Sequence, residues 1–443
     1  MTNVRRCAVI RRAIAIPMYL AVGFACAFVP VDAAAQGCRN LNYDEAKVGS
    51  YTVPDPLMSK DGTRIADVEA WKATRRDEIM RDFRDLMYGH TPELPVKLQA
   101  HVVGVRKDAL GGMATRTIVR LQLFDDPTAP QIHLMYYVPN DTTKPVPMFL
   151  GLNFSGNASI EDDPAIPLPS GWMRPQKDGV ANNRATEALR GTDAASWPIK
   201  LAIERGYGVA TFYYGDVEPD HLEGWRDGIR GYALKLAGRT ERGPHEWGAL
   251  GAWGWGLSRA MDHLETVPAV DAKRVVVFGH SRLGKTALWA GAQDERFAIV
   301  VSNNSGEGGA ALARRNFGEN IDCSIAHASW RYCDRFRDYA NRADELPFDQ
   351  HMLLGLIAPR PIYVASATND GGADPKGEFV TAMHAEPVYR LFGLRGVDTT
   401  TWPPPDEPIG QSIGYHLRTG NHNITAYDWK EYLKFADRHF SEP

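Results

Sequence analysis

The sequence predicts an α/β protein with a mixed, mostly parallel sheet that carries helices on both faces. Short runs that alternate apolar and polar residues lie between residues 96 and 138, and this period is typical of antiparallel strands. From residue 198 onward, apolar strand-like runs alternate with helical runs, which implies right-handed crossovers and a parallel sheet. The 443 residues suit one large domain. We expect this domain at 61–443, after a signal peptide at 1–35 and a linker at 36–60.

The first elements of the domain are a helix and a meander of strands. Apolar residues recur at helical spacing over Val68–Met87. Polarity then alternates along Val96–Val105, Thr115–Phe124 and Gln131–Val138, and turn residues separate these three runs. Val146–Phe154 is apolar almost throughout, as expected of a strand that is buried on both faces.

The second half of the domain is predicted as alternating helices and strands. The helices are expected at Ile199–Arg205, Gly248–Leu264, from Arg282 onward, and at Ala426–Phe440. The strands are expected at Gly208–Tyr214, Arg274–Gly279, Phe297–Ser302, Pro361–Ala367 and Gly414–Leu417. Residues 155–197 and 303–350 lack a clear period, and long segments of this kind in a compact domain usually shape a binding site.

The first 35 residues have the pattern of a secretory signal peptide. Four arginines precede an apolar stretch from Ala13 towards Val31, and three alanines at 33–35 offer a cleavage site. Pro17 and Pro30 interrupt the stretch, so we expect export to the periplasm or the medium rather than a membrane span. Lipidation of Cys38 is an alternative fate of the mature N-terminus.

Charge and cysteine content indicate which partners, disulfides and metals we expect for the chain. The formal net charge is −4 and becomes −7 without residues 1–35, which argues against nucleic acid as a partner. An exported chain permits disulfides, and we predict a bond between Cys323 and Cys333, which are close in sequence. The same segment holds too few cysteine and histidine ligands for zinc, so we predict no metal.

A strand, a tight turn and a helix meet at Ser281. The run from Arg274 is rich in β-branched residues, and helix-forming residues follow Gly284. A serine in such a turn projects its hydroxyl above the sheet, and the helix N-terminus offers N–H groups to a developing oxyanion. We therefore predict Ser281 as a nucleophile, although Leu283 stands where the usual elbow motif has its second glycine.

The partners of a nucleophilic serine follow from their places in the chain. His422 lies in the loop before the last predicted helix, where the general base of this arrangement stands, whereas His416 falls inside a strand. Asp370 follows the penultimate strand and is our candidate for the acid. Asp374 is a rival, but its place before a proline favours a helix cap. We expect His280 to point away from Ser281.

Several motifs together resemble one family. The elbow Gly-His-Ser-Arg-Leu-Gly-Lys at 279–285, the run Asn-Ser-Gly-Glu-Gly-Gly-Ala-Ala-Leu at 304–312, the run Arg-Arg-Asn-Phe-Gly-Glu at 314–319 and the motif Ala-Asp-Pro-Lys-Gly-Glu at 373–378 resemble the bacterial glucuronoyl esterases of carbohydrate esterase family 15. The resemblance covers about residues 60–440. It implies an α/β-hydrolase fold, in which the sheet lies between two helix layers, and cleavage of esters between lignin alcohols and the 4-O-methyl-glucuronic acid branches of xylan.

The resemblance also implies roles for four further residues. Arg282 would add a charged donor to the oxyanion site. Lys285 and Glu319 would bind hydroxyl groups of the uronate ring. Trp330 would line the pocket.

Two positions depart from the family pattern. Fungal members carry the acid of the triad as a glutamate where this chain has Asn304, so the acid here is expected to be Asp370, as in other bacterial members, with Glu307 as the alternative. Many bacterial members carry a tryptophan two residues after the aspartate, where this chain has Gly372. The stacking of that side chain on the sugar is therefore lost.

The predicted function is that of a cofactor-free serine esterase acting on glucuronoyl esters of glucuronoxylan or lignin–carbohydrate linkages, and we expect the protein to be a monomer. One alternative is an acetyl or aryl ester hydrolase on decorated xylan that uses the same triad. Another is a carbohydrate-binding protein on a hydrolase scaffold that has lost turnover, since a fold alone does not establish chemistry.

Overall fold

The computed structural model describes residues 38, 41–175 and 178–441, and the predicted signal peptide lies outside them. Within these residues one sheet of ten strands runs through the molecule in the order β1-β2-β3-β7-β4-β8-β9-β10-β12-β11. The strands are β1 (Gln99–Asp108), β2 (Ala114–Gln122), β3 (Gln131–Pro139), β4 (Val146–Asn153), β7 (Gly208–Tyr213), β8 (Val270–His280), β9 (Phe297–Asn303), β10 (Ile362–Ala367), β11 (Ile409–Gly410) and β12 (Ile413–Arg418). A separate hairpin joins β5 (Val180–Ala181) to β6 (Arg184–Ala185).

The sheet is antiparallel at both edges and parallel in the middle. Strands β1, β2, β3 and β7 pair antiparallel, and so do β11 and β12. From β7 through β4, β8, β9 and β10 to β12 every neighbouring pair is parallel. This is the mixed sheet of an α/β-hydrolase fold, as the sequence predicts.

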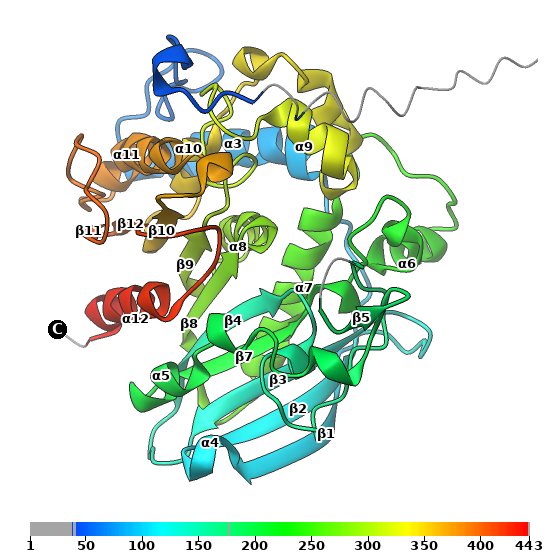
Figure 1. The fold of residues 1–443 in the computed structure, drawn as a ribbon. Helices are drawn as coiled ribbons and strands as arrows, with labels where there is room; N and C mark the ends of the chain where they lie inside the picture. Colours follow the sequence, from blue (N-terminus) through cyan, green and yellow to red (C-terminus); the bar gives the residue numbers. More distant parts are fainter. Residues whose placement is uncertain (1–37, 39–40, 176–177, 442–443) are drawn as a thin grey trace, which may run out of the picture.

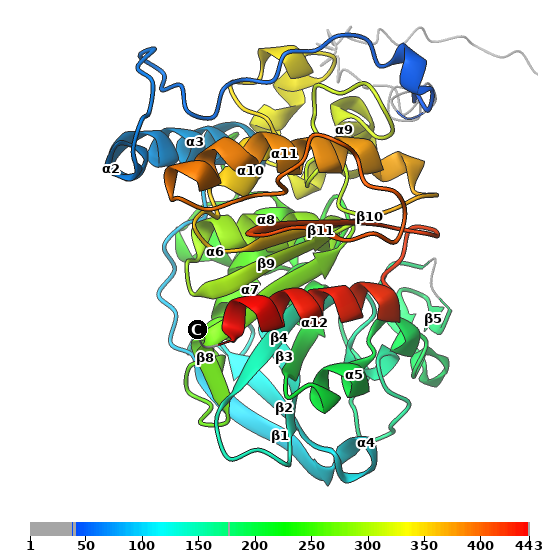
Figure 2. The same cartoon turned by 90° about the vertical axis from the view of Figure 1, so that its left-hand side faces the viewer.

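Helices cover both faces of the sheet (Figures 1 and 2). The longer helices are α3 (Arg76–Phe83), α5 (Ile199–Glu204), α6 (Ile229–Leu236), α7 (Ala249–Leu264), α8 (Arg282–Gln293), α9 (Ile321–Ala328), α10 (Gln350–Gly355), α11 (Pro375–Leu391) and α12 (Ala426–Phe440). α3 lies inside a helical stretch from Val68 to Tyr88 that also contains α2 (Val68–Ala70) and two π-helical turns, and α4 (Ala109–Gly112) is the turn between β1 and β2.

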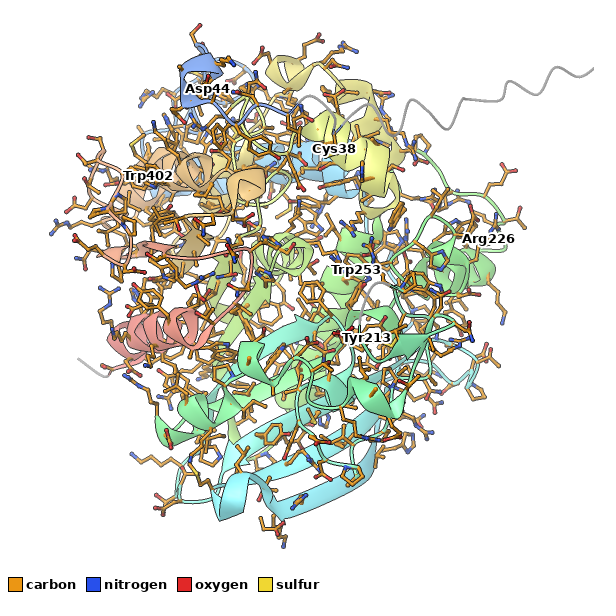
Figure 3. All side chains as sticks on the ribbon, in the orientation of Figure 1. Cys38, Asp44, Tyr213, Arg226, Trp253 and Trp402 are labelled. Atoms are coloured by element: carbon orange, nitrogen blue, oxygen red, sulfur yellow. A yellow bond between two sulfur atoms is a disulfide. The ribbon has the colours of Figure 1, made fainter. Side chains whose placement is uncertain are left out.

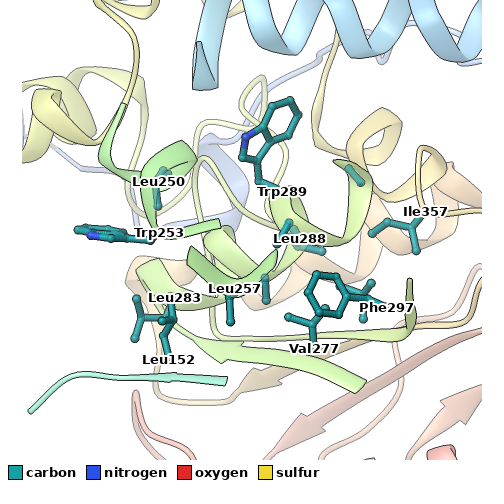
Figure 4. Close-up of a cluster of buried hydrophobic side chains, with 14 of the residues drawn as sticks. Leu152, Leu250, Trp253, Leu257, Val277, Leu283, Leu288, Trp289, Phe297 and Ile357 are labelled. Carbon is teal, nitrogen blue, oxygen red and sulfur yellow. The ribbon is translucent and has the colours of Figure 1, made fainter. Parts of the chain in front are cut away.

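Alternation along the central strands produces two cores. Val275 and Val277 of β8 belong to the core under α7 and α8, whereas Val276 and Phe278 belong to the core under α5 and α12. Figure 4 shows part of the first core, where Trp253 and Leu257 of α7 lie beside side chains of α8 and β8. Because both faces of β8 are buried from Val275 to Phe278, this part of the strand is apolar without interruption.

The linker is predicted at 36–60, and its described part is attached to the body of the domain. The amide of Gly318 donates to the carbonyl of Asn42 at 2.8 Å, and His351 contacts the carbonyl of Pro54 at 2.9 Å. Cys38 and Asp44 accordingly lie at the same end of the molecule as α9 and α11 (Figures 1 and 3).

The predicted disulfide between Cys323 and Cys333 is wrong. Cys323 is bonded to Cys38, 285 residues away in sequence, and Cys333 is a free, buried thiol. The reason is direction: Cys323 faces the N-terminal segment, whereas the amide of Cys333 donates to the carbonyl of Met87 at 2.8 Å, which holds this residue against the first helical stretch. The sulfur of Cys38 lies in this disulfide, which argues against the alternative of lipidation at Cys38.

Candidate active site

Ser281 stands in the sharp turn between β8 and α8. Its backbone has φ 56° and ψ −131°, a conformation that non-glycine residues rarely adopt and that is often found at functional sites. The turn is tight because a Cβ atom on Gly279 would lie 2.0 Å from the carbonyl oxygen of Leu283. Gly284 is confined too, since its Cβ would lie 3.1 Å from Ser305 Cβ. The glycine three residues after the serine therefore lets α8 pack against the neighbouring loop.

Two pockets meet at Ser281 and His422, which line both of them. The small pocket has a volume of about 150 Å³ and is lined by polar groups that include Lys285, Glu319 and Asp370. The large pocket has a volume of about 420 Å³. Its wall combines apolar and cationic side chains, among them Phe154, Met173, Arg174, Tyr214 and Arg282.

Asp370 is the carboxylate that contacts His422. Its Oδ2 lies 2.6 Å from Nδ1 of His422 and also accepts a hydrogen bond of 2.7 Å from Nδ2 of Asn304. Burial alone would raise the pKa of Asp370, but the contact with His422 and the Asn304 hydrogen bond hold the pKa below its usual value. Asn304, which stands where fungal members are expected to carry the acid, therefore supports Asp370 in this chain.

The rival carboxylates have other contacts. Glu307 is fully buried and accepts a hydrogen bond from Ser324 Oγ of α9. Asp374 caps α11 by accepting from the Gly377 amide at 3.0 Å, and it pairs with Arg315 at 2.8 Å. The cap predicted for Asp374 is therefore confirmed.

His280 does not point away from the site as expected. It lines the large pocket, and its ring centroid lies 4.5 Å from that of His422. Its Nδ1 contacts Oδ1 of Asn303 at 2.6 Å. Burial, and next the charge of His422, lower the pKa of His280 to about 4, so this neighbour stays neutral at ordinary pH.

Arg282 is held by a buried carboxylate that sequence reasoning missed. Nε of Arg282 lies 2.9 Å from Oδ2 of Asp220 in an ion pair that lacks the alignment of a hydrogen bond. The guanidinium also lies 4.6 Å from the ring centroid of Phe154. This arrangement fixes the cation in the wall of the large pocket, which Ser281 also lines.

Asp220 gathers further donors around the same carboxylate. Arg331 binds it through two nitrogens at 2.9 and 2.7 Å, Arg174 contacts it at 3.1 Å, and the indole of Trp330 donates to it at 2.8 Å. Burial alone would raise the pKa of Asp220, but the charges of Arg331 and Arg282 hold the pKa well below its usual range. Trp330 is not among the residues that line the two pockets, in contrast to its expected position.

Lys285 and Glu319 both line the small pocket. Lys285 is almost fully buried, and its ammonium donates to the backbone carbonyl of Glu307. Burial lowers the pKa of Lys285, against the opposing effect of Glu307 and Glu319. Glu319 is exposed at the rim, and its amide donates to the carbonyl of Gly372 at 2.9 Å.

Gly372 leaves open space in the small pocket. A Cβ atom there would find its nearest neighbour, Oδ1 of Asp370, at 4.0 Å. The glycine is therefore not required by packing, and the missing aromatic side chain leaves room that a ligand can fill.

The known proteins to which this chain is similar include glucuronoyl esterases and a carbohydrate esterase. Residues 192–393 match the family described as glucuronyl esterase of fungi. The chain is 47% identical over 408 residues, 91% of this chain and 93% of the other, to carbohydrate esterase MZ0003 from an unknown prokaryotic organism. A glucuronoyl esterase from Solibacter usitatus is 46% identical, with a TM-score of 0.85 over 90% of this chain and 100% of that one. A CE15 glucuronoyl esterase from Teredinibacter turnerae is 30% identical, with a TM-score of 0.77 over 93% and 100% of the two chains.

Proposed function

The chain belongs to carbohydrate esterase family 15, and from this premise and its site geometry we propose a serine esterase that hydrolyses esters of glucuronic acid and its 4-O-methyl derivative. The observation that carries the proposal is the meeting of two pockets at Ser281 and His422, with Asp370 behind the imidazole. An ester bound across Ser281 has one pocket for its acyl part and another for its alcohol.

The acyl part belongs in the small pocket. Its volume of about 150 Å³ suits a single sugar ring, and its polar wall suits hydroxyl groups. Lys285 donates to ring hydroxyls, and Glu319 accepts from them. The leaving alcohol then occupies the large pocket, where Phe154, Met173 and Tyr214 supply apolar contacts for an aromatic or alkyl group.

The reaction follows the logic of a serine–histidine–acid triad. His422 takes the proton of the Ser281 hydroxyl while Oγ attacks the ester carbonyl, and Asp370 stabilises the imidazolium that forms. The positive end of α8 and the side chain of Arg282 stabilise the oxyanion of the tetrahedral intermediate. His422 then gives its proton to the leaving alcohol, and the uronate stays bound to Ser281 as an ester. In the second half of the reaction His422 takes a proton from water, the water oxygen attacks the ester carbonyl, and Ser281 leaves with the proton that His422 returns.

We also propose that the protein is exported. The disulfide between Cys38 and Cys323 supports this, because such bonds persist in oxidising compartments. In the part of the chain that the structure describes, no helix is long and apolar enough to cross a membrane. A monomeric state remains a prediction, which the molecular mass of the purified protein in solution tests.

A comparison of substrates tests the function. The mature protein is assayed with benzyl glucuronate, with acetylated xylan and with 4-nitrophenyl acetate. We expect benzyl glucuronate to have by far the highest kcat/KM, because the small pocket binds the uronate hydroxyls in the transition state. Equal or faster hydrolysis of acetylated xylan would favour the alternative of an acetyl or aryl esterase. No turnover of any ester would favour a carbohydrate-binding protein.

A further inference from the structure

Tyr43 presents an exposed aromatic ring beside the small pocket. It is 58% exposed, yet its ring lies against the backbone of Gly371, where a Cβ atom would be 3.1 Å from Cδ1 of the tyrosine. Gly371 stands between Asp370 and Gly372, which both line that pocket. The N-terminal segment therefore brings an aromatic side chain to the rim on the side where Gly372 leaves space.

The ring is fixed in place although most of it faces solvent. The carbonyl of Asn42 accepts from Gly318 at 2.8 Å, and its side chain donates to the carbonyl of Asn316 at 2.6 Å. Phe317, between these two residues, meets the Tyr43 ring edge to face with the centroids 6.1 Å apart. Loop 316–319 therefore connects Tyr43 to Glu319 at the pocket.

Two stronger attachments flank the tyrosine. On one side, the disulfide joins Cys38 to Cys323 at the start of α9. On the other, Glu45 forms ion pairs with Arg315 and, at 2.7 Å, with Lys376. Figures 1 and 3 show this N-terminal segment lying over the end of the molecule that contains α9 and α11. A ring held in this way loses little conformational freedom when a ligand covers it.

The orientation of the proposed substrate also places a sugar near Tyr43. In a pyranuronate, the ester carbon is attached to C5 and the glycosidic bond leaves from C1, at the other side of the ring oxygen. Because C1 and C5 both adjoin the ring oxygen, these two bonds diverge from one edge of the ring, and with the ester at Ser281 and the uronate in the small pocket we place the attached glycan outside the large pocket, which the leaving alcohol occupies. The small pocket holds about one ring, so the next sugar lies at its rim, by Gly372 and Glu319.

Resting on the proposed function, we propose that Tyr43 is a binding residue for the sugar to which the uronate is attached. The C–H groups of one pyranose face pack on the phenol ring, which buries apolar surface, and the phenol hydroxyl remains free to bind a sugar hydroxyl. Tyr43 thereby distinguishes a uronate on an oligosaccharide from a free uronate ester. The disulfide serves this site by fixing the segment that carries the ring.

Two benzyl esters and two variants test the proposal. The first ester carries glucuronic acid alone, and the second carries the same acid linked to a xylo-oligosaccharide. We expect Tyr43→Ala to lower kcat/KM roughly five- to tenfold on the oligosaccharide ester, and less than about twofold on the single-sugar ester. Tyr43→Phe keeps the ring and should keep at least half of the preference for the oligosaccharide.

Equal losses on the two esters would overturn the inference, because they would reduce Tyr43 to a support for the loop of Asp370. No loss on either ester would overturn it as well. A wild-type protein that turns over neither ester would overturn the proposed function and the inference with it. Calorimetry provides a second readout: in a Ser281→Ala background, Tyr43→Ala should weaken binding of the glucuronoxylo-oligosaccharide acid by a similar factor and leave glucuronate binding unchanged.

Discussion

Replacing Asp370 by asparagine keeps the shape of the side chain and removes the negative charge that faces His422. The carboxylate oxygen lies 2.6 Å from Nδ1 and accepts a second hydrogen bond of 2.7 Å from Asn304, and the Asp370 side chain is buried. An amide group that donates to Nδ1 would place the imidazole proton on Nε2. That nitrogen could then no longer accept the proton of Ser281.

The expected loss follows from this geometry. Both the tautomer and the stabilisation of the imidazolium disappear, so Asp370→Asn should lower kcat by roughly 10²–10⁴, or about 3–5 kcal/mol in the activation free energy. KM should change little, because the side chain acts through His422 in the transition state. Steady-state kinetics on benzyl glucuronate measure both constants, and thermal unfolding checks that the variant is folded.

Glu307→Gln is the matched control. Its carboxylate is bonded to Ser324 rather than to His422, so we expect a kcat loss of less than about tenfold. The reverse ranking of the two variants would refute the assignment of Asp370 as the acid. Equal losses would mean that both carboxylates act on the histidine.

Three further outcomes are expected. Gly372→Trp should lower KM for benzyl glucuronate about two- to tenfold, since the site has room for a ring that stacks on the sugar; a higher KM would show that the ring blocks the pocket. Asp220→Asn should lower kcat roughly 10–100-fold, because Arg282 is no longer held beside Ser281. Adding Arg282→Ala to this variant should lower kcat little further. Additive losses of kcat in this double-mutant cycle would contradict the coupling between Asp220 and Arg282. Between pH 6.5 and about 4 the unfolded chain protonates His280 and the folded protein does not, so the free energy of unfolding decreases on acidification. Urea unfolding at pH 7 and at pH 4.5 measures this decrease, and His280→Gln should make it smaller by about 1–3 kcal/mol. An unchanged decrease in the variant would refute the contribution of His280.

Most of the fold could be predicted because the signals are local. The central strands are apolar on both faces. The elbow at Ser281 needs Gly279 because a Cβ atom there would clash with the carbonyl of Leu283, only four residues further along the chain. Only the start of helix α11 is predicted, by the cap at Asp374, and its length is not, because the helix contains Gly377 and Pro387 and its apolar residues follow no clear helical period.

The unpredicted parts of the site depend on contacts between distant segments. Asp220 gains its importance only when arginines at 174, 282 and 331 converge on it. In the same way, the pairing of Cys38 with Cys323 depends on the folded path of the N-terminal segment, whereas sequence proximity favours Cys333. Such convergence leaves no pattern at any one position of a single sequence.

The most direct test of the proposed chemistry is the turnover of benzyl glucuronate by Ser281→Ala. The variant lacks the attacking oxygen and keeps both pockets, so kcat should fall at least 10³-fold while calorimetry finds glucuronate bound as tightly as by the parent protein. A variant that keeps more than about a tenth of the parent activity would contradict Ser281 as the nucleophile.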